Sequence, residues 1–125
     1  MNAAATSAAE PVLYGIVNCD TVKRSRAWFA ERGIGVQFHD LRKSGVPADR
    51  LDAWIAAVGW EKLVNRQGLT WKKLDAPVRE RVVDAASARA LMLASPSVIK
   101  RPVVEAPGGA VSVGYAPDEW ARRLT

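Results

Sequence analysis

A strand, a turn and a helix follow one another directly near the start of the chain, and this order constrains the fold most. Val12–Val17 is an apolar run of strand type, and a helical pattern starts at Val22, after turn and N-cap residue types. Gly33 is suited to end this helix, and Val36–His39 alternates in the manner of a second strand. These residues predict a β-α-β unit, in which a right-handed crossover joins two parallel strands.

The middle of the chain is predicted to be mainly helical. Periodic apolar residues and helix-ending residues give three segments: a helix Ala48–Val58 ended by Gly59, a helix Val78–Ala85 with Pro77 in its first turn, and a helix capped by Ser87 that stops at Ser95–Pro96. Two stretches are expected to be a polar loop and a connector, respectively Asp40–Pro47 and Leu63–Trp71.

The last third returns to strands. Val98–Glu105 is an apolar run interrupted by a basic pair and a proline, Pro107–Ala110 is a hairpin turn, and Val111–Tyr115 is the returning strand. Pro117 opens a final short helix. The order predicts an α/β fold: a thioredoxin-like, four-stranded mixed sheet (βαβ…ββα) with an inserted helical lobe at about residues 46–97.

The only cysteine, Cys19, lies at the junction of the first strand and its helix. A thiol just before a helix faces unpaired backbone N–H groups and the positive end of the helix dipole. Lys23 and Arg24, about one turn further on, add positive charge, and all three effects favour the thiolate. Cys19 is therefore a candidate nucleophile. The alternative is a buried, inert cysteine that acts as a small apolar side chain.

Length and charge limit the classes of protein. A chain of 125 residues predicts a single domain, at residues 12–125, and one cysteine cannot form an internal disulfide. The net charge of +5 fits an anionic substrate, a nucleic acid or an acidic protein surface. Because the basic residues are scattered in pairs, nucleic-acid binding is disfavoured. With one cysteine and one histidine, no metal site of the usual ligands is expected.

The N-terminal residues and the hydropathy of the chain predict the cellular compartment of the protein. Residues 1–11 lack a basic segment followed by an apolar one, so we expect a disordered leader rather than a signal peptide. The chain has no run of about 18 apolar residues, which predicts no transmembrane helix. We therefore expect a cytoplasmic protein.

Four motifs resemble those of the ArsC/Spx family, in the same order along the chain. They are Asn18–Arg24, Phe38–Asp40, Asn65–Trp71 and Ile99–Val104. Within this family the chain most resembles the YffB-type branch, whose members are proposed glutathione-dependent thiol reductases. The resemblance covers about Val12 to Leu124, and it implies the thioredoxin-like fold already predicted from the pattern of strands and helices.

The resemblance also implies roles for particular residues. Cys19 would be the nucleophile, and Arg66 and Arg101 would hold an anionic substrate and stabilise the thiolate. Pro102 would be the cis proline that thioredoxin-like folds place beside the cysteine, so that Asn18 and Pro102 supply the backbone of the cleft. Glutathione is implied as co-substrate, and no metal.

Two departures from the family narrow the chemistry. Arsenate reductases of this family carry a further arginine in the returning strand, where this chain has Val113–Tyr115, so one anion-binding arginine is missing. Spx regulators often carry a second cysteine three residues after the first, where this chain has Val22. An external thiol must therefore complete any disulfide chemistry at Cys19.

Two functions remain open from the sequence. The first is a monothiol oxidoreductase, glutathione-linked, that uses Cys19 on a disulfide or on a small oxyanion such as arsenate. The alternative is a non-enzymatic, Spx-like module that docks on an acidic protein surface such as that of RNA polymerase. His39 is expected to be a polar strand cap rather than a base. Trp71 is expected either to pack in the interior or to line the cleft.

Overall fold

The computed structural model describes residues 10–124, which form two compact units. The first unit consists of residues 10–40 and 101–124, and the second is Leu41–Lys100. The second unit contains the helical insert that the sequence predicts at about residues 46–97. The single domain predicted for residues 12–125 stays a prediction.

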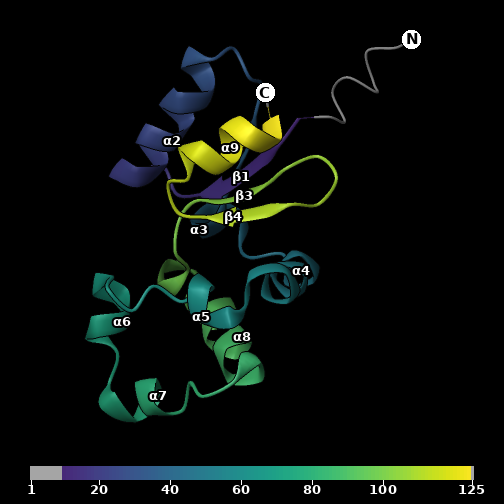
Figure 1. Cartoon of the computed structure of the whole chain (residues 1–125). Helices are drawn as coiled ribbons and strands as arrows, with labels where there is room; N and C mark the ends of the chain where they lie inside the picture. The colour runs from purple at the N-terminus through teal and green to yellow at the C-terminus, as the bar shows by residue number, and fades with distance from the viewer. Residues whose placement is uncertain (1–9, 125) are drawn as a thin grey trace. The chain divides into compact units, whose positions relative to one another are not determined.

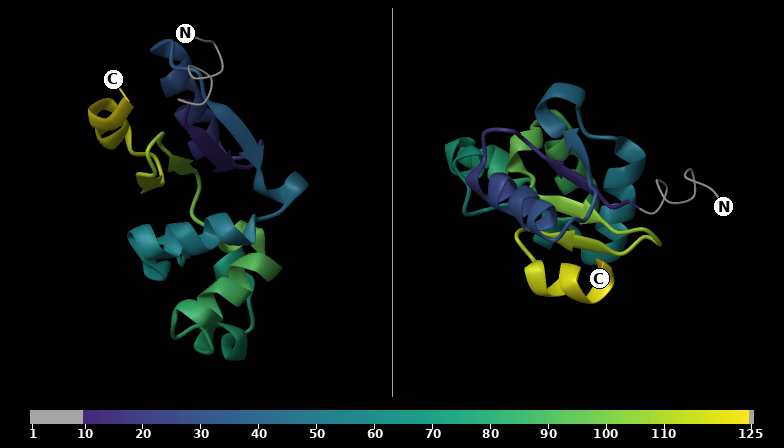
Figure 2. Two further views of the ribbon diagram at one scale, coloured as in Figure 1. Left: turned by 90° about the vertical axis from the view of Figure 1, so that its right-hand side faces the viewer. Right: turned by 90° about the horizontal axis from the view of Figure 1, so that it is seen from above.

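The first unit is built on a four-stranded mixed sheet. Its strands are β1 (Val12–Gly15), β2 (Gln37–Asp40), β3 (Val103–Glu105) and β4 (Val111–Val113), and its helices are α2 (Asp20–Glu31) and α9 (Pro117–Leu124). The strand order is β2-β1-β3-β4, with β1 parallel to β2 and the other two pairs antiparallel. Both views of Figure 2 show α9 next to the β3–β4 hairpin. The predicted thioredoxin-like βαβ…ββα sheet is confirmed.

Helices α2 and α9 cover one face of this sheet (Figure 1). Leu13 of β1 and Val104 of β3 face each other across the strands and point into a core formed with both helices. Phe29 of α2 and Trp120 of α9 meet there, with ring centroids 5.0 Å apart. The buried indole Nε1–H of Trp120 donates to Ser112 Oγ at 2.8 Å, so the polar tip of the ring keeps a partner in the core.

The second unit is helical. Its elements are α3 (Leu41–Ser44), α4 (Ala48–Val58), α5 (Trp60–Leu63), α6 (Leu69–Lys73), α7 (Ala76–Glu80), α8 (Ala85–Ala94) and the 3₁₀-helix η1 (Pro96–Val98), shown in teal and green in Figure 1. The N–H of Lys100 donates to the carbonyl of Leu63 at 2.7 Å, and that of Asn65 to Val98 at 2.8 Å. These bonds tie the segment after α5 to the end of the unit, in which Trp54 of α4 and Met92 of α8 are fully buried.

Several predicted boundaries in the second unit are wrong. The polar loop expected at Asp40–Pro47 contains the short helix α3, whose Leu41 is fully buried. The connector contains α6, and the helix expected at Val78–Ala85 is instead α7 at Ala76–Glu80. Burial of Leu41, which a local pattern does not reveal, stabilises α3, whereas α6 and α7 contain no buried residue.

Two further corrections have local causes. The cap of α8 is Asp84 rather than Ser87: Asp84 Oδ1 accepts the Ser87 N–H at 2.9 Å, and Ser87 Oγ accepts the Asp84 N–H at 3.1 Å. This is a reciprocal capping box, in which serine takes the third helical position. The run predicted as a strand from Val98 to Glu105 pairs as a strand only from Val103, after Pro102, which has no N–H to donate.

The predicted leader lies mostly outside the described residues, since residues 1–9 are not among them. Pro11, also assigned to the leader, is buried, and its carbonyl accepts the N–H of Gln37 at 2.9 Å. This bond belongs to the parallel pairing of β1 with β2, in which Gln37 lies opposite Val12.

Candidate functional site

Cys19 occupies the N-cap of α2, with extended backbone angles of φ −143° and ψ 120°. Its carbonyl accepts the N–H of Lys23 at 2.9 Å, which starts the helix. The side chain is half-buried and packs against the core of the first unit. The thiol therefore lies where the helix offers its unpaired N–H groups and positive dipole end, and part of it remains open to solvent.

Gly15, at the end of β1, determines how closely α2 approaches the strand. A Cβ placed on Gly15 would lie 2.7 Å from Cγ2 of Val22, a distance that carbon atoms do not adopt. Only glycine lets the first turn of α2 lie this close to the strand end. The turn that carries Cys19 is thereby held against the sheet.

Arg101 and Pro102 lie at the same end of the sheet as Cys19. Tyr14 of β1 is paired with Val103 of β3, so the antiparallel register continues toward Pro102 opposite Gly15. The Arg101–Pro102 peptide bond is cis, as predicted, and the buried Pro102 accepts the N–H of Gly114 at 2.8 Å through its carbonyl. Arg101 is half-buried beside this proline.

The two basic residues predicted near the thiol, Lys23 and Arg24, are both exposed on the first turns of α2. The guanidinium carbon of Arg24 lies 4.1 Å from the centroid of the Tyr115 ring, a cation–π contact. Tyr115 in turn meets Trp120 edge-on at 5.6 Å. Asn18, the remaining candidate in this unit, is exposed in the turn before Cys19.

Arg66 belongs to the second unit, in the turn between α5 and α6, and is exposed. Its guanidinium carbon lies 5.4 Å from the ring of Trp60 and 5.8 Å from that of Trp71. The turn is tight: a Cβ on Gly68 would come within 2.9 Å of the Asn65 side chain. Trp71, for which packing and cleft lining were both open, is half-buried and contacts Arg66.

The structure thus gathers most of the predicted residues in the first unit, namely Asn18, Cys19, Lys23, Arg24, Arg101 and Pro102. Two further residues contact the predicted arginines, although the sequence did not indicate them. The ring of Tyr115 stacks against Arg24, and that of Trp60 against Arg66. No sequence spacing predicts such contacts. His39, expected to cap its strand, is half-buried in β2 with its ring 5.1 Å from that of Tyr14.

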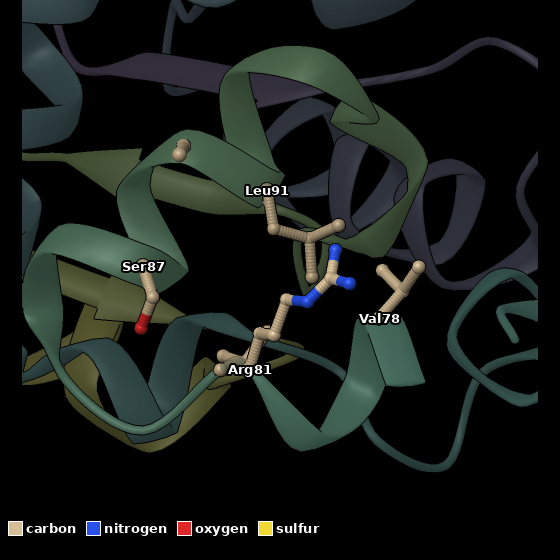
Figure 3. Close-up of a pocket in the computed structure, with 6 residues that line it drawn as sticks. Val78, Arg81, Ser87 and Leu91 are labelled. Atoms are coloured by element: carbon tan, nitrogen blue, oxygen red, sulfur yellow. The ribbon is translucent and has the colours of Figure 1, made fainter. Parts of the chain in front are cut away.

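A pocket in the second unit lies between α7 and α8 and contains none of the predicted site residues. Figure 3 shows the Arg81 side chain extended toward Leu91 and Val78 along its wall. The hydroxyl of Ser87, also in the lining, already takes part in the capping box of α8. The pocket has apolar walls and one guanidinium, and it carries no nucleophile.

Within residues 10–124, no three His, Cys, Asp or Glu side chains lie close enough together to hold a metal ion. Over the same residues, no helix is long and apolar enough to cross a membrane.

Known proteins place the chain in a family. The sequence pattern of the ArsC family matches residues 14–123, nearly the whole chain. The chain belongs to the ArsC family. A relative from Haemophilus influenzae with no described function is 35% identical over 108 residues, which cover 86% of this chain and 93% of the relative.

Two solved structures are similar to this chain in both sequence and fold. One is a YffB protein, with 44% identity, a TM-score of 0.85, and coverage of 92% of this chain and 99% of its own. The other, an arsenate reductase (ArsC) related protein from Brucella melitensis, has 46% identity, a TM-score of 0.70, and coverage of 93% and 95%. The predicted resemblance to the YffB-type branch is confirmed. Family membership, together with the half-buried cysteine, supports a thiol-dependent reductase as the general class.

Proposed function

We propose that this protein is a monothiol reductase, in which Cys19 attacks a disulfide and a small external thiol, such as glutathione, releases the product. The observation that carries the proposal is the position of the chain's only cysteine, half-buried at the N-cap of the 12-residue helix α2. Such positions favour the thiolate, which is the form that attacks sulfur.

Cys19 takes part in two exchange steps. In the first, the Cys19 thiolate attacks one sulfur of the substrate disulfide, the S–S bond breaks, and the other sulfur leaves as a thiolate. In the second, an external thiolate attacks the mixed disulfide on its substrate sulfur, which returns Cys19 as a thiolate and gives a new disulfide. These two steps consume one external thiol, and the new disulfide joins that thiol to the second half of the substrate. A second external thiol then exchanges with this disulfide and releases the second half, so the two external thiols supply the two electrons and end as their own disulfide.

The other candidate residues have supporting roles in this proposal. Lys23 and Arg24 add positive potential near the start of α2, and Arg101 lies with Pro102 at the same end of the sheet. Asn18 and Pro102 supply backbone groups along which an extended thiol substrate would lie. Arg66 would bind an anionic part of the substrate through its guanidinium, which two indole rings flank.

A disulfide fits better than arsenate as the substrate. The end of β4 and the two residues after it are Val113–Tyr115, where arsenate reductases of the family carry an additional arginine, so the chain has fewer groups to hold an oxyanion. We propose the cytoplasm as the compartment, because the reaction consumes reduced small thiols, which the cytoplasm maintains.

The test compares the same cysteine in the folded and unfolded chain. At neutral pH, oxidised glutathione should form a single adduct with Cys19, and the rate should be about tenfold higher in buffer than in denaturant. Mass spectrometry measures the adduct, and a coupled assay with glutathione and a small disulfide measures turnover. Equal or slower reaction of the folded chain would contradict the proposal. It would favour the docking module instead, in which Cys19→Ala leaves the function intact.

A further inference from the structure

Three arginines at or next to α2 stack on aromatic rings, but their surroundings differ. Arg24 lies 4.1 Å from the Tyr115 ring centroid, Arg26 lies 4.3 Å from that of Phe38, and Arg32 lies 4.1 Å from that of Trp28. Arg32 also donates to the Trp28 carbonyl and lies 3.9 Å from Glu31. Within residues 10–124, Arg24 stacks on the Tyr115 ring and forms no ion pair with a carboxylate.

Arg24 is also the member of this set nearest to the thiol along the helix. It lies five positions after Cys19, a rise of about 7.5 Å along the axis. Its aromatic partner Tyr115 packs against the same core cluster as Cys19. Tyr115 directly follows Gly114, whose N–H is bonded to the carbonyl of Pro102. The Arg24–Tyr115 pair therefore belongs to the end of the first unit that holds Cys19 and Pro102.

The ring changes what the guanidinium can do. Stacking covers one face of the guanidinium plane and restricts its rotation, while the N–H groups at its edge stay available. A carboxylate binds this edge through two parallel hydrogen bonds, and a pre-oriented arginine loses less side-chain entropy when it binds. A thiol that has similar reactivity but no carboxylate cannot form these two hydrogen bonds with the guanidinium of Arg24.

We propose that Arg24, oriented by Tyr115, is a specificity-determining residue that binds a carboxylate of the thiol co-substrate. This inference rests on the proposed function, and it narrows the co-substrate to small thiols that carry a carboxylate several ångströms from their sulfur. Tyr115 is then a positioning residue, which acts through Arg24. Glutathione has this chemistry, whereas 2-mercaptoethanol lacks a carboxylate.

The experiment measures the second exchange step with two thiols. Cys19 is first converted to a mixed disulfide with a small neutral thiol, and the rates of its release by glutathione and by 2-mercaptoethanol are then compared. Arg24→Gln should lower the rate with glutathione about tenfold and the rate with 2-mercaptoethanol less than about twofold. Because both thiols release the same Cys19 thiolate, the ratio of the rates removes any effect of the substitution on the cysteine itself.

Arg26→Gln is the matched control. It removes an exposed, ring-stacked arginine from the same helix, two residues along, and should leave the ratio unchanged. Tyr115→Phe keeps the ring and should keep the preference, whereas Tyr115→Leu should reduce it. The salt dependence is a further sign, because an exposed guanidinium–carboxylate pair weakens as ionic strength rises.

A binding measurement separates failure of this inference from failure of the proposed function. S-methylglutathione keeps both carboxylates but cannot exchange, so its binding, followed by NMR titration, does not depend on reactivity of Cys19. We expect weaker binding to Arg24→Gln than to the native chain or to Arg26→Gln. The inference is overturned if Cys19 exchanges normally but Arg24→Gln lowers the release rates with glutathione and with 2-mercaptoethanol by the same factor. It is also overturned if the substitution changes neither rate. If Cys19 forms no mixed disulfide in the native chain, the proposed function fails, and the inference fails with it.

Discussion

Replacement of Gly15 by alanine tests whether the close approach of α2 to β1 holds the cysteine-bearing turn in place. The new Cβ would lie 2.7 Å from Val22 Cγ2, 3.2 Å from Val22 Cγ1 and 3.5 Å from Leu13 Cδ2. Carbon atoms in contact prefer about 3.5–4.0 Å, so the helix must retreat by roughly 1 Å or Val22 must change rotamer. Val22 is fully buried in the core, which leaves it little freedom to move.

The expected loss of stability is that of an overpacked core, about 1–3 kcal/mol in the free energy of unfolding. Val22→Ala alone should cost about 2 kcal/mol, since it removes two buried methyl groups and leaves a small cavity. In the double variant, the added methyl group of residue 15 enters the space that Val22 vacates. The double variant should therefore be more stable than the sum of the single losses predicts, by about 1 kcal/mol.

Urea denaturation of the four proteins gives these free energies, and alkylation of Cys19 at fixed pH reports on the turn. We expect Gly15→Ala to change the alkylation rate and the double variant to restore it toward the native value. Additive losses of stability would refute the reasoning, because they would mean that residue 15 and Val22 do not interact. Gly33→Ala is a useful contrast: Gly33 has φ +66° and open space around its Cα, so any loss there comes from the backbone alone.

Two further predictions concern polar groups that stabilise single elements. Ser112→Ala removes the acceptor of the buried Trp120 Nε1–H and should lower the free energy of unfolding by about 1–3 kcal/mol, as measured by urea denaturation; a change within about 0.5 kcal/mol would contradict this role. Hydrogen bonds from the Ser87 side chain and backbone lower the pKa of Asp84, so its contribution to stability is present above the usual carboxyl range and is lost as pH falls through the lowered value. Asp84→Asn should therefore flatten the decline of the thermal midpoint below about pH 4, and a curve parallel to that of the native chain would count against the capping box.

Patterns within single elements predicted much of the fold. The helix Ala48–Val58 was predicted to the residue, because its apolar period ends at Gly59, where the backbone has φ +87°. The four-stranded mixed sheet followed from the β-α-β start and the terminal hairpin, since handedness and short connections leave few alternatives. The cis bond before Pro102 was implied by family resemblance alone, and no local pattern specifies it.

What the sequence did not predict depends on contacts between distant segments. Arg24 and Tyr115 meet although they are far apart in the chain, and Trp60 and Trp71 approach Arg66 through the folding of a turn. Such pairs form when whole elements pack together, and the residues around one partner do not indicate which residue the other partner will be. The thiol itself was found because its signal, a cysteine between a strand and a helix, is contained in a few consecutive residues.

The closure of the helical insert on itself has a consequence for how the sheet assembles. Strands β1 and β3 pair directly, although most of the chain lies between them. In an unfolded chain, closing so long a loop costs entropy before the pairing returns any energy. Helix α3, at the start of the second unit, contacts η1 near its end, and the Leu63–Lys100 hydrogen bond fastens the last residue of that unit. Once the insert has folded, mainly α2 and β2 remain in the loop between β1 and β3. The loop that must close to pair these strands is then much shorter, so this long-range pairing should form faster.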